Sequence, residues 1–294
     1  LEFRRVLFRS SRVALNVTAR LPKTTDPCGR VDYPRKTHTS EKIAIGRADY
    51  QMTDKHTIFA RYQLAQYDSA ADYDPGNVLA YSLSPLDDTV HSIAIGDMYL
   101  FGANAVNSFR MGYNDADIQK PYIHFFDAQE MGVRNIANLM PGHMRVAVSG
   151  GFTIGGSGPG ASSTPTQSLQ FGDDFSIVKG AHQIGVGGVV VRQAIQAESY
   201  VNAAGTFSFT GAITGLGFGD FLLGRTNTFQ QGMVYKLYDR SLYTSVYVQD
   251  SWRLTPRLMT NLGLRWEPYR PYTEEDRKST RLNSSHVSES RMPS

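Results

Sequence analysis

The chain has 294 residues and a formal net charge of +3, with 41% hydrophobic and 19% charged residues. This length suffices for one large domain or two small ones, but no run approaches the roughly eighteen apolar residues of a membrane-spanning helix, which excludes a helical membrane protein. Cys28 is the single cysteine, so an internal disulfide and a thiolate metal cluster are also excluded.

The two ends of the chain are related at the level of DNA. A codon choice for residues 1–10 (LEFRRVLFRS), reverse-complemented and read one base in, encodes DRKSTRLNS, residues 276–284. That DNA resembles the adapter ligated to both ends of sequencing fragments. We therefore expect residues 1–10 and 276–294 to be adapter-derived, and residues 11–275 to be genuine. The alternative is a natural basic tail at each end.

Removing these ends changes the charge balance. They hold seven Lys or Arg against three Asp or Glu, so the remaining 11–275 carries a net charge of −1. The basic pI of about 8.9 comes from the two ends, so it is no sign of a nucleic-acid partner, and we predict none.

Apolar and polar residues alternate with period two in paired segments along the chain, the pattern of β-hairpins. Three pairs flank the short turns 53–56, 102–105 and 179–182: 42–51 with 57–67, 89–101 with 106–118, and 169–178 with 183–194. A fourth pair is the plainest, because Leu242, Val246 and Val248 alternate with polar positions and the pattern resumes at 258–266 after the turn at 255–256.

The connections between hairpins are long, at 68–88, 119–166 and 196–240, whereas the turns inside them are short. Strands of about a dozen residues can cross a bilayer, and tight turns at one end with long loops at the other are typical of outer-membrane barrels. The sequence therefore predicts an all-β fold in the outer membrane: an antiparallel outer-membrane β-barrel fragment, as an open curved sheet of about 8–10 long hairpin strands with long external loops.

The loops have some predicted structure of their own. Residues 12–22 could form a short helix, 219–224 one helical turn, and 206–210 could pair with 226–234. The glycine-rich 150–160 has no GK[ST] sequence after it, so it is predicted to be a flexible loop and not a phosphate-binding one.

The polar sides of the strands supply candidate site residues, because a barrel interior holds water or a plug whereas the exterior meets lipid. The lumen-facing candidates are Asp49, Arg61, Gln63, Arg110, Asn114, Arg265 and Glu267. We expect them to contact plug and water. The alternative is a ladder of cross-strand pairs without substrate contact, so none is assigned as a substrate ligand.

Other chemistry is not predicted. His124, Asp127 and His143 share one external loop, but their spacing is not typical of a zinc or iron site. No nucleophile elbow or triad is visible, so we predict neither an enzyme nor a bound cofactor or metal. His56 and His182 are expected to be solvated in tight turns. Several aromatic residues are expected at strand ends or on lipid faces: Tyr99, Phe101, Phe109, Tyr113, Tyr247, Trp252, Trp266 and Tyr269.

Several segments resemble one family. The sequence YTSVYVQDSWRLTPRLMTNLGLRWEPY, Tyr243–Tyr269, resembles the strand-turn-strand in the later part of TonB-dependent receptor barrels, in particular the Oar-like group. GRADYQMTDKHTIFARYQ (46–63) and FSIVKGAHQIGVGG (175–188) are similar to earlier hairpins of that group, and GTFSFTG followed by GDFLLG, within 205–224, is similar to its external loop.

The resemblance implies a barrel of about twenty-two strands plugged by an N-terminal domain. It also implies outer-membrane lipid, a plug domain and the TonB energy complex as partners, and uptake of a scarce solute such as an iron chelate, cobalamin or an oligosaccharide. No plug or energy-coupling box is recognisable here, so coupling is assigned to no residue. Two alternatives stay open: a small eight-stranded outer-membrane barrel with an adhesive or structural role, and a secreted all-β binding module.

Overall fold

The computed structural model describes residues 10–34, 38–71, 73–81, 84–156, 161–268 and 270–274. Nearly all of the two segments predicted to be adapter-derived lie outside these ranges, and their boundaries stay predictions. No helix in the described part of the chain is long and apolar enough to cross a membrane.

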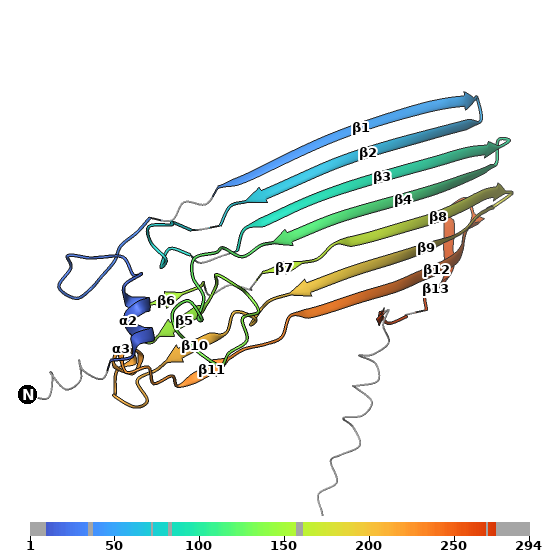
Figure 1. The fold of residues 1–294 in the computed structure, drawn as a ribbon. Coiled ribbons are helices and arrows are strands. Elements are labelled where there is room, and N and C mark those ends of the chain that lie inside the picture. The colour runs from blue at the N-terminus through green and yellow to red at the C-terminus, as the bar shows by residue number, and fades with distance from the viewer. Residues whose placement is uncertain are drawn as a thin grey trace, which may run out of the picture.

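Eight long antiparallel strands dominate the structure (Figure 1). They confirm the four predicted hairpins and extend most of them by a few residues. In chain order they are β1 (Thr39–Thr53), β2 (His56–Ser69), β3 (Leu86–Phe101), β4 (Ala105–Lys120), β8 (Thr166–Lys179), β9 (His182–Ser199), β12 (Tyr235–Thr255) and β13 (Leu258–Trp266). Gly180 in the β8–β9 turn has a φ of 63°, the left-handed conformation that glycine adopts at no steric cost.

Each long strand pairs with its neighbours in the chain, from β1 at one edge to β13 at the other. The short β7 (Ser162–Ser163) and β14 (Thr273–Glu274) extend the pairing of β4 and β9 and of β12, which makes a 10-stranded sheet. Among the described residues β1 pairs with β2 alone and β13 with β12 alone, so the sheet is open, as predicted.

The pairing register divides the side chains between two faces. We call the side that carries Asp49, Arg110 and Arg265 the polar face, and the side that carries Ile58, Phe109 and Leu264 the apolar face. Large hydrophobic side chains of the apolar face are solvent-exposed in this chain: Tyr62, Ile93, Ile95, Phe109, Phe171, Val186, Val190, Val246, Val248, Leu262, Leu264 and Trp266. No second layer of the described chain buries them, so this face is built for an apolar surrounding.

The tight turns descend steadily across the sheet. Strand by strand, the residues opposite His56 are Tyr99, Asn107, Phe175, Val186, Val248 and Leu264. Leu264 is therefore in line with His56, the first residue of β2, but β13 itself begins six residues earlier, at Leu258. Six strand-to-strand steps separate β2 from β13, so the turn end shifts by one residue per strand. The starts of β4 and β9 fall on the same line. One residue per strand, at about 3.3 Å per residue and about 4.8 Å between strands, means strands tilted by about 35° to the barrel axis.

The buried hydrophobic residues gather in the long loops. The helices and short strands of these loops lie at the end of the sheet away from the tight turns (Figure 1). This loop cluster contains α2 (Arg12–Thr18), α3 (Gly217–Leu222) and a small sheet of β5 (Arg145–Val148), β6 (Thr153–Ile154), β10 (Thr206–Phe209) and β11 (Thr228–Gln230). Both predicted helices and the pairing of β10 with β11 are confirmed. The parallel pairing of β10 with β5 was not predicted.

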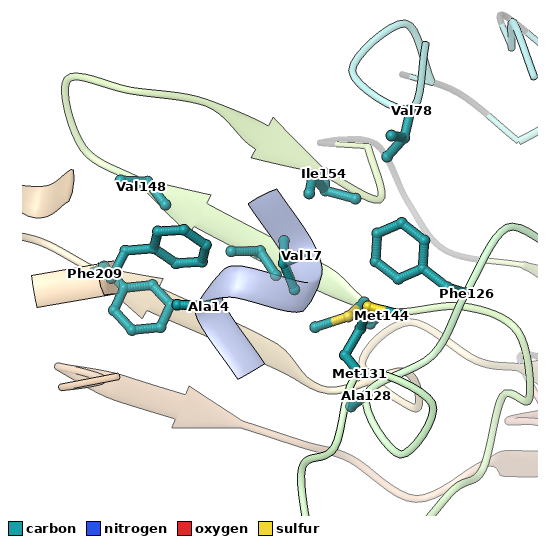
Figure 2. Packing of buried hydrophobic residues seen from close by; sticks show 12 residues of the cluster. Ala14, Val17, Val78, Phe126, Ala128, Met131, Met144, Val148, Ile154 and Phe209 are labelled. Carbon is teal, nitrogen blue, oxygen red and sulfur yellow. The ribbon is translucent and has the colours of Figure 1, made fainter. Parts of the chain in front are cut away.

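The helix α2 lies at the centre of this cluster. Ser11 caps its first turn by accepting a hydrogen bond from the Ala14 amide at 3.5 Å. Ala14 and Val17, three residues apart on one helical face, are buried against Phe209 and Met144 (Figure 2). Residues that precede the first strand thus belong to the same loop cluster as residues that follow β4 and β9.

Candidate functional site

The polar face brings the predicted site residues together. Asp49 lies on β1, Arg61 and Gln63 on β2, Arg110 and Asn114 on β4, and Arg265 on β13, all with the same orientation in the pairing register. Glu267 follows β13 and forms an ion pair with Arg265. Their contact with plug or water stays a prediction.

A first group occupies the β1 edge of this face. The guanidinium of Arg47 donates to Asp49 Oδ1 at 2.6 Å and lies 4.2 Å from the centre of the Phe59 ring. That ring covers Gly96 so closely that a Cβ at Gly96 would lie 2.0 Å from Phe59 Cε1. Arginine, aromatic ring and bare glycine therefore stack in order, which supports an edge where β1 pairs with β2 alone in the described part of the chain.

The central group is built around Asp174 of β8. Arg110 forms an ion pair with Asp174, whose Oδ1 accepts a hydrogen bond from the Tyr247 hydroxyl at 2.7 Å. On β13, Arg265 lies opposite Tyr247 and donates to two other side chains of β12, to Ser245 Oγ at 3.1 Å and to the Tyr243 hydroxyl at 3.3 Å. The two groups adjoin at β12, where Tyr247 lies opposite Arg265, and together they form a polar-face network over β4, β8, β12 and β13.

Glycines form the floor beneath this network. Gly112, Gly172, Gly185, Gly187 and Gly263 all point to the polar face. The floor is tightest at Gly187, where a Cβ would lie 2.5 Å from Asp174 Oδ1 and 2.6 Å from the Tyr247 ring. The glycines therefore let the network's own side chains pack directly on the strand backbone, as Asp174 and Tyr247 do over Gly187.

Sequence reasoning missed two members of the network, Asp174 and Tyr247. Tyr247 was predicted at a strand end or on a lipid face, which is wrong, because the register puts it opposite Arg265. The signal was available: Tyr247 shares the alternation of Tyr243 and Ser245, and Asp174 that of Ser168 and Gln170. Tyr269 lies outside the described residues.

Asn114 belongs to a separate hydrogen-bond ladder nearer the loops. It accepts from Ser92 Oγ at 2.5 Å and donates to Ser168 Oγ at 3.4 Å, which joins three neighbouring strands. Arg61 and Gln63 lie on the same face, in register with Arg47 and Ile45. The bonds of Asn114 with Ser92 and Ser168 form a cross-strand ladder of the kind that stabilises sheets.

The loop residues weighed as metal ligands have other roles. The carboxylate of Asp127 accepts hydrogen bonds from the amides of Glu130 and Gly142 and from Asn138. Burial opposes the charge on Asp127, but these hydrogen bonds outweigh it and lower the pKa. Within the described ranges, no three His, Cys, Asp or Glu side chains gather closely enough to hold a metal ion.

His143 is buried among aromatic rings in the same loop. Its Nδ1 lies 2.9 Å from the carbonyl oxygen of Ile123, and its ring meets Tyr81 edge-on. Burial, chiefly, lowers the pKa of His143, with Arg145 and His124 adding to the effect. The ring is a neutral part of the loop core, with one nitrogen held by the backbone.

The loop cluster contains an open hollow of about 930 Å³ beside Phe152 and Phe218. Tyr33, Tyr81 and Arg30 also line it, and the exposed Cys28 lies at its wall. The loop end thus presents a mixed aromatic and polar concavity, the kind of surface that small-molecule sites use.

His56 and His182 are not solvated turn residues, contrary to the prediction. Each opens a strand and pairs with an aspartate: His56 Nε2 lies 2.5 Å from Asp97 Oδ2, and His182 Nδ1 lies 2.6 Å from Asp250 Oδ2. The turn consists of fewer residues than predicted, so both rings lie on the sheet and are partly buried there.

The comparisons with known proteins agree with this architecture. The structure is similar to that of the outer membrane transporter YddB from Escherichia coli, with 13% sequence identity and a TM-score of 0.50. The alignment covers 84% of this chain and 30% of the transporter, so the chain spans less than a third of its length. A search of the curated proteins found no match. The profile of the outer membrane beta barrel domain family matches residues 7–292. The chain therefore belongs to the outer membrane beta barrel domain family, and it is a β-barrel protein of the outer membrane.

Proposed function

We propose that the chain forms part of the barrel wall of a TonB-dependent transporter that takes up a scarce solute of the iron-chelate, cobalamin or oligosaccharide class. The observation that carries this proposal is an open wall with a charged network on the polar face and a structured loop cluster at one end. The segments of residues 46–63, 175–188 and 243–269 that resemble TonB-dependent receptors support it.

The proposal includes partners that only the whole protein would engage. Membrane lipid covers the apolar face, a plug domain meets the polar face, and the TonB energy complex acts through the plug. The proposed role includes no enzymatic step, cofactor or nucleic acid.

The two alternatives have less support. A self-contained eight-stranded barrel must close, yet β1 and β13 have no partner but their hairpin neighbours among the described residues. A secreted module should cover its apolar side with a second layer, which the exposed Leu262, Leu264 and Trp266 do not have.

Uptake measured in cells tests the proposal. Cells with and without the gene, each with an intact or an inactivated TonB complex, are given labelled ferric chelates, cobalamin and oligosaccharides. We expect uptake of one of these classes to require both the gene and the TonB complex. Uptake of all three that is independent of the gene, together with loss of cell adhesion in its absence, would replace transport with the adhesive role.

A further inference from the structure

Two side-chain groups of the same design lie on the apolar face at the tight-turn end. We call them the His–Asp clasps: His56 with Asp97 and Tyr99, and His182 with Asp250 and Trp252. In each, the histidine is the first residue of the second strand of a hairpin and lies opposite the aromatic residue of the next strand. The ring centres are 5.3 Å apart in the first clasp and 5.1 Å in the second.

The tilt of the strands puts the two clasps at one level. His182 lies four residues nearer the turns than Val186, the residue in line with His56, and four strand steps separate β2 from β9. With a descent of one residue per strand, His56 and His182 lie at equal heights along the barrel axis. In an untilted sheet, Val186 would be level with His56.

A second row of polar residues runs parallel to the row of the two clasps, nearer the loops. On the apolar face Gln66, Asp115 and Arg192 each lie ten residues beyond the first residue of their own strand, His56, Ala105 and His182. Ten residues at about 3.3 Å each, on strands tilted by about 35°, span about 27 Å along the axis. The apolar band of outer-membrane barrels is about 25 Å tall.

Several polar groups inside this band have partners, although Asp250 Oδ1 accepts no hydrogen bond from the described residues. Asp97 and Asp250 are bound by the clasp histidines, and Asn107 donates to Asp173 Oδ1 at 2.6 Å. Asp97, Asn107 and Asp250 lie in the half of the band nearer the turns, and Asp173 lies at its middle. An unpaired carboxylate would be costly there, whereas a paired one beside an aromatic ring is suited to a boundary between hydrocarbon and water.

We propose that the His–Asp clasps bind the phospholipid headgroup layer on the turn side of the membrane and hold the barrel at that depth. Rings of histidine, tyrosine and tryptophan are amphipathic and settle at this level. Lys179 opposes His182 in register, and Lys55 directly precedes His56 in the chain, so each clasp has a lysine next to its histidine, as suits a boundary with anionic lipid headgroups. This proposal rests on the outer-membrane barrel and is independent of transport.

Cysteine labelling in lipid vesicles tests the level of the boundary. In a Cys28→Ser background, His56→Cys, His182→Cys and Val186→Cys are placed one at a time in the full chain, which is inserted into phosphatidylcholine–phosphatidylglycerol vesicles. A thiol reacts with a water-soluble maleimide as the thiolate, which forms only where water reaches it. We expect H56C and H182C to react at similar rates and V186C about tenfold more slowly. Equal rates for V186C and H56C, or for all three sites, would overturn the proposal.

Tryptophan quenching tests the same level with both clasps intact. Trp266→Phe leaves Trp252 as the single tryptophan, and the chain is inserted into vesicles whose lipids carry bromine either near the headgroup or near the chain terminus. We expect stronger quenching by bromine near the headgroup. Stronger quenching by the deep bromine, or quenching by neither, would contradict a boundary at the clasps.

Discussion

A side chain at Gly187 on the polar face would meet strand backbone as well as two side chains. Gly187→Ala would put a methyl group 2.5 Å from Asp174 Oδ1, 2.6 Å from the Tyr247 ring and 2.7 Å from the carbonyl oxygen of Asp173. The first two groups can rotate away, but the carbonyl belongs to the strand backbone. The substitution therefore separates Tyr247 from Asp174 and strains the β8–β9 pairing.

The expected loss of stability follows from these contacts. Separating Tyr247 from the carboxylate removes a hydrogen bond to a charged group, worth about 1.5–3 kcal/mol, and the overlap adds about 1–3 kcal/mol of overpacking. Alanine restricts the unfolded chain more than glycine does, which offsets about 0.4–1 kcal/mol. The free energy of unfolding should therefore fall by about 2–5 kcal/mol.

Urea unfolding of the chain in lipid vesicles, followed by tryptophan fluorescence, measures this change. Gly112→Ala is the matched control, because its Cβ would meet nothing closer than Gln170 Cβ at 3.9 Å on the same face. We expect G112A to stay within about 1 kcal/mol of the parent. Tyr247→Phe, which removes the hydrogen bond without overlap, should fall between the two. If G187A is as stable as G112A, the tight floor described above is wrong.

Three further predictions concern the loop cluster. Because burial lowers the pKa of His143, the unfolded loop binds the proton more readily than the folded loop does. The contribution of His143 to loop stability is therefore complete above a pH of about 6.5 and decreases as the pH falls below it. Hydrogen-exchange protection of 121–145 should be lower at pH 5.5 than at pH 7.5, and His143→Asn should remove this difference. Asp220→Ala removes the buried carboxylate that accepts hydrogen bonds from the hydroxyl and the amide of Thr214 at 2.7 and 2.8 Å, so protease should cleave the loops faster while the hairpins resist, and unchanged cleavage would count against this role. Phe209→Ala should destabilise the loop core by about 3–5 kcal/mol, measured as local exchange, with Phe229→Ala on the exposed side as the milder control.

The sequence by itself determined the strands. Period-two alternation and glycine turns are local signals, so the four hairpins, the short helices near 12–22 and 219–224, and the common face of the candidates from Asp49 to Arg265 were all predictable. The apolar side needs no distant partner within the chain, because lipid takes that place in the outer membrane. The strands are therefore predictable from local alternation even though most of the sheet buries no core.

Interactions across strands needed the tertiary structure. Asp174 meets Arg110 and Tyr247 only once the four strands β4, β8, β9 and β12 are in register, and the pairing of His56 with Asp97 joins residues from different hairpins. The packing of α2 against Phe209 and the parallel pairing of β5 with β10 also join loops that are far apart in the chain. Alternation specifies which face a side chain points to, whereas its neighbours on that face depend on register and strand tilt, which are properties of the assembled sheet.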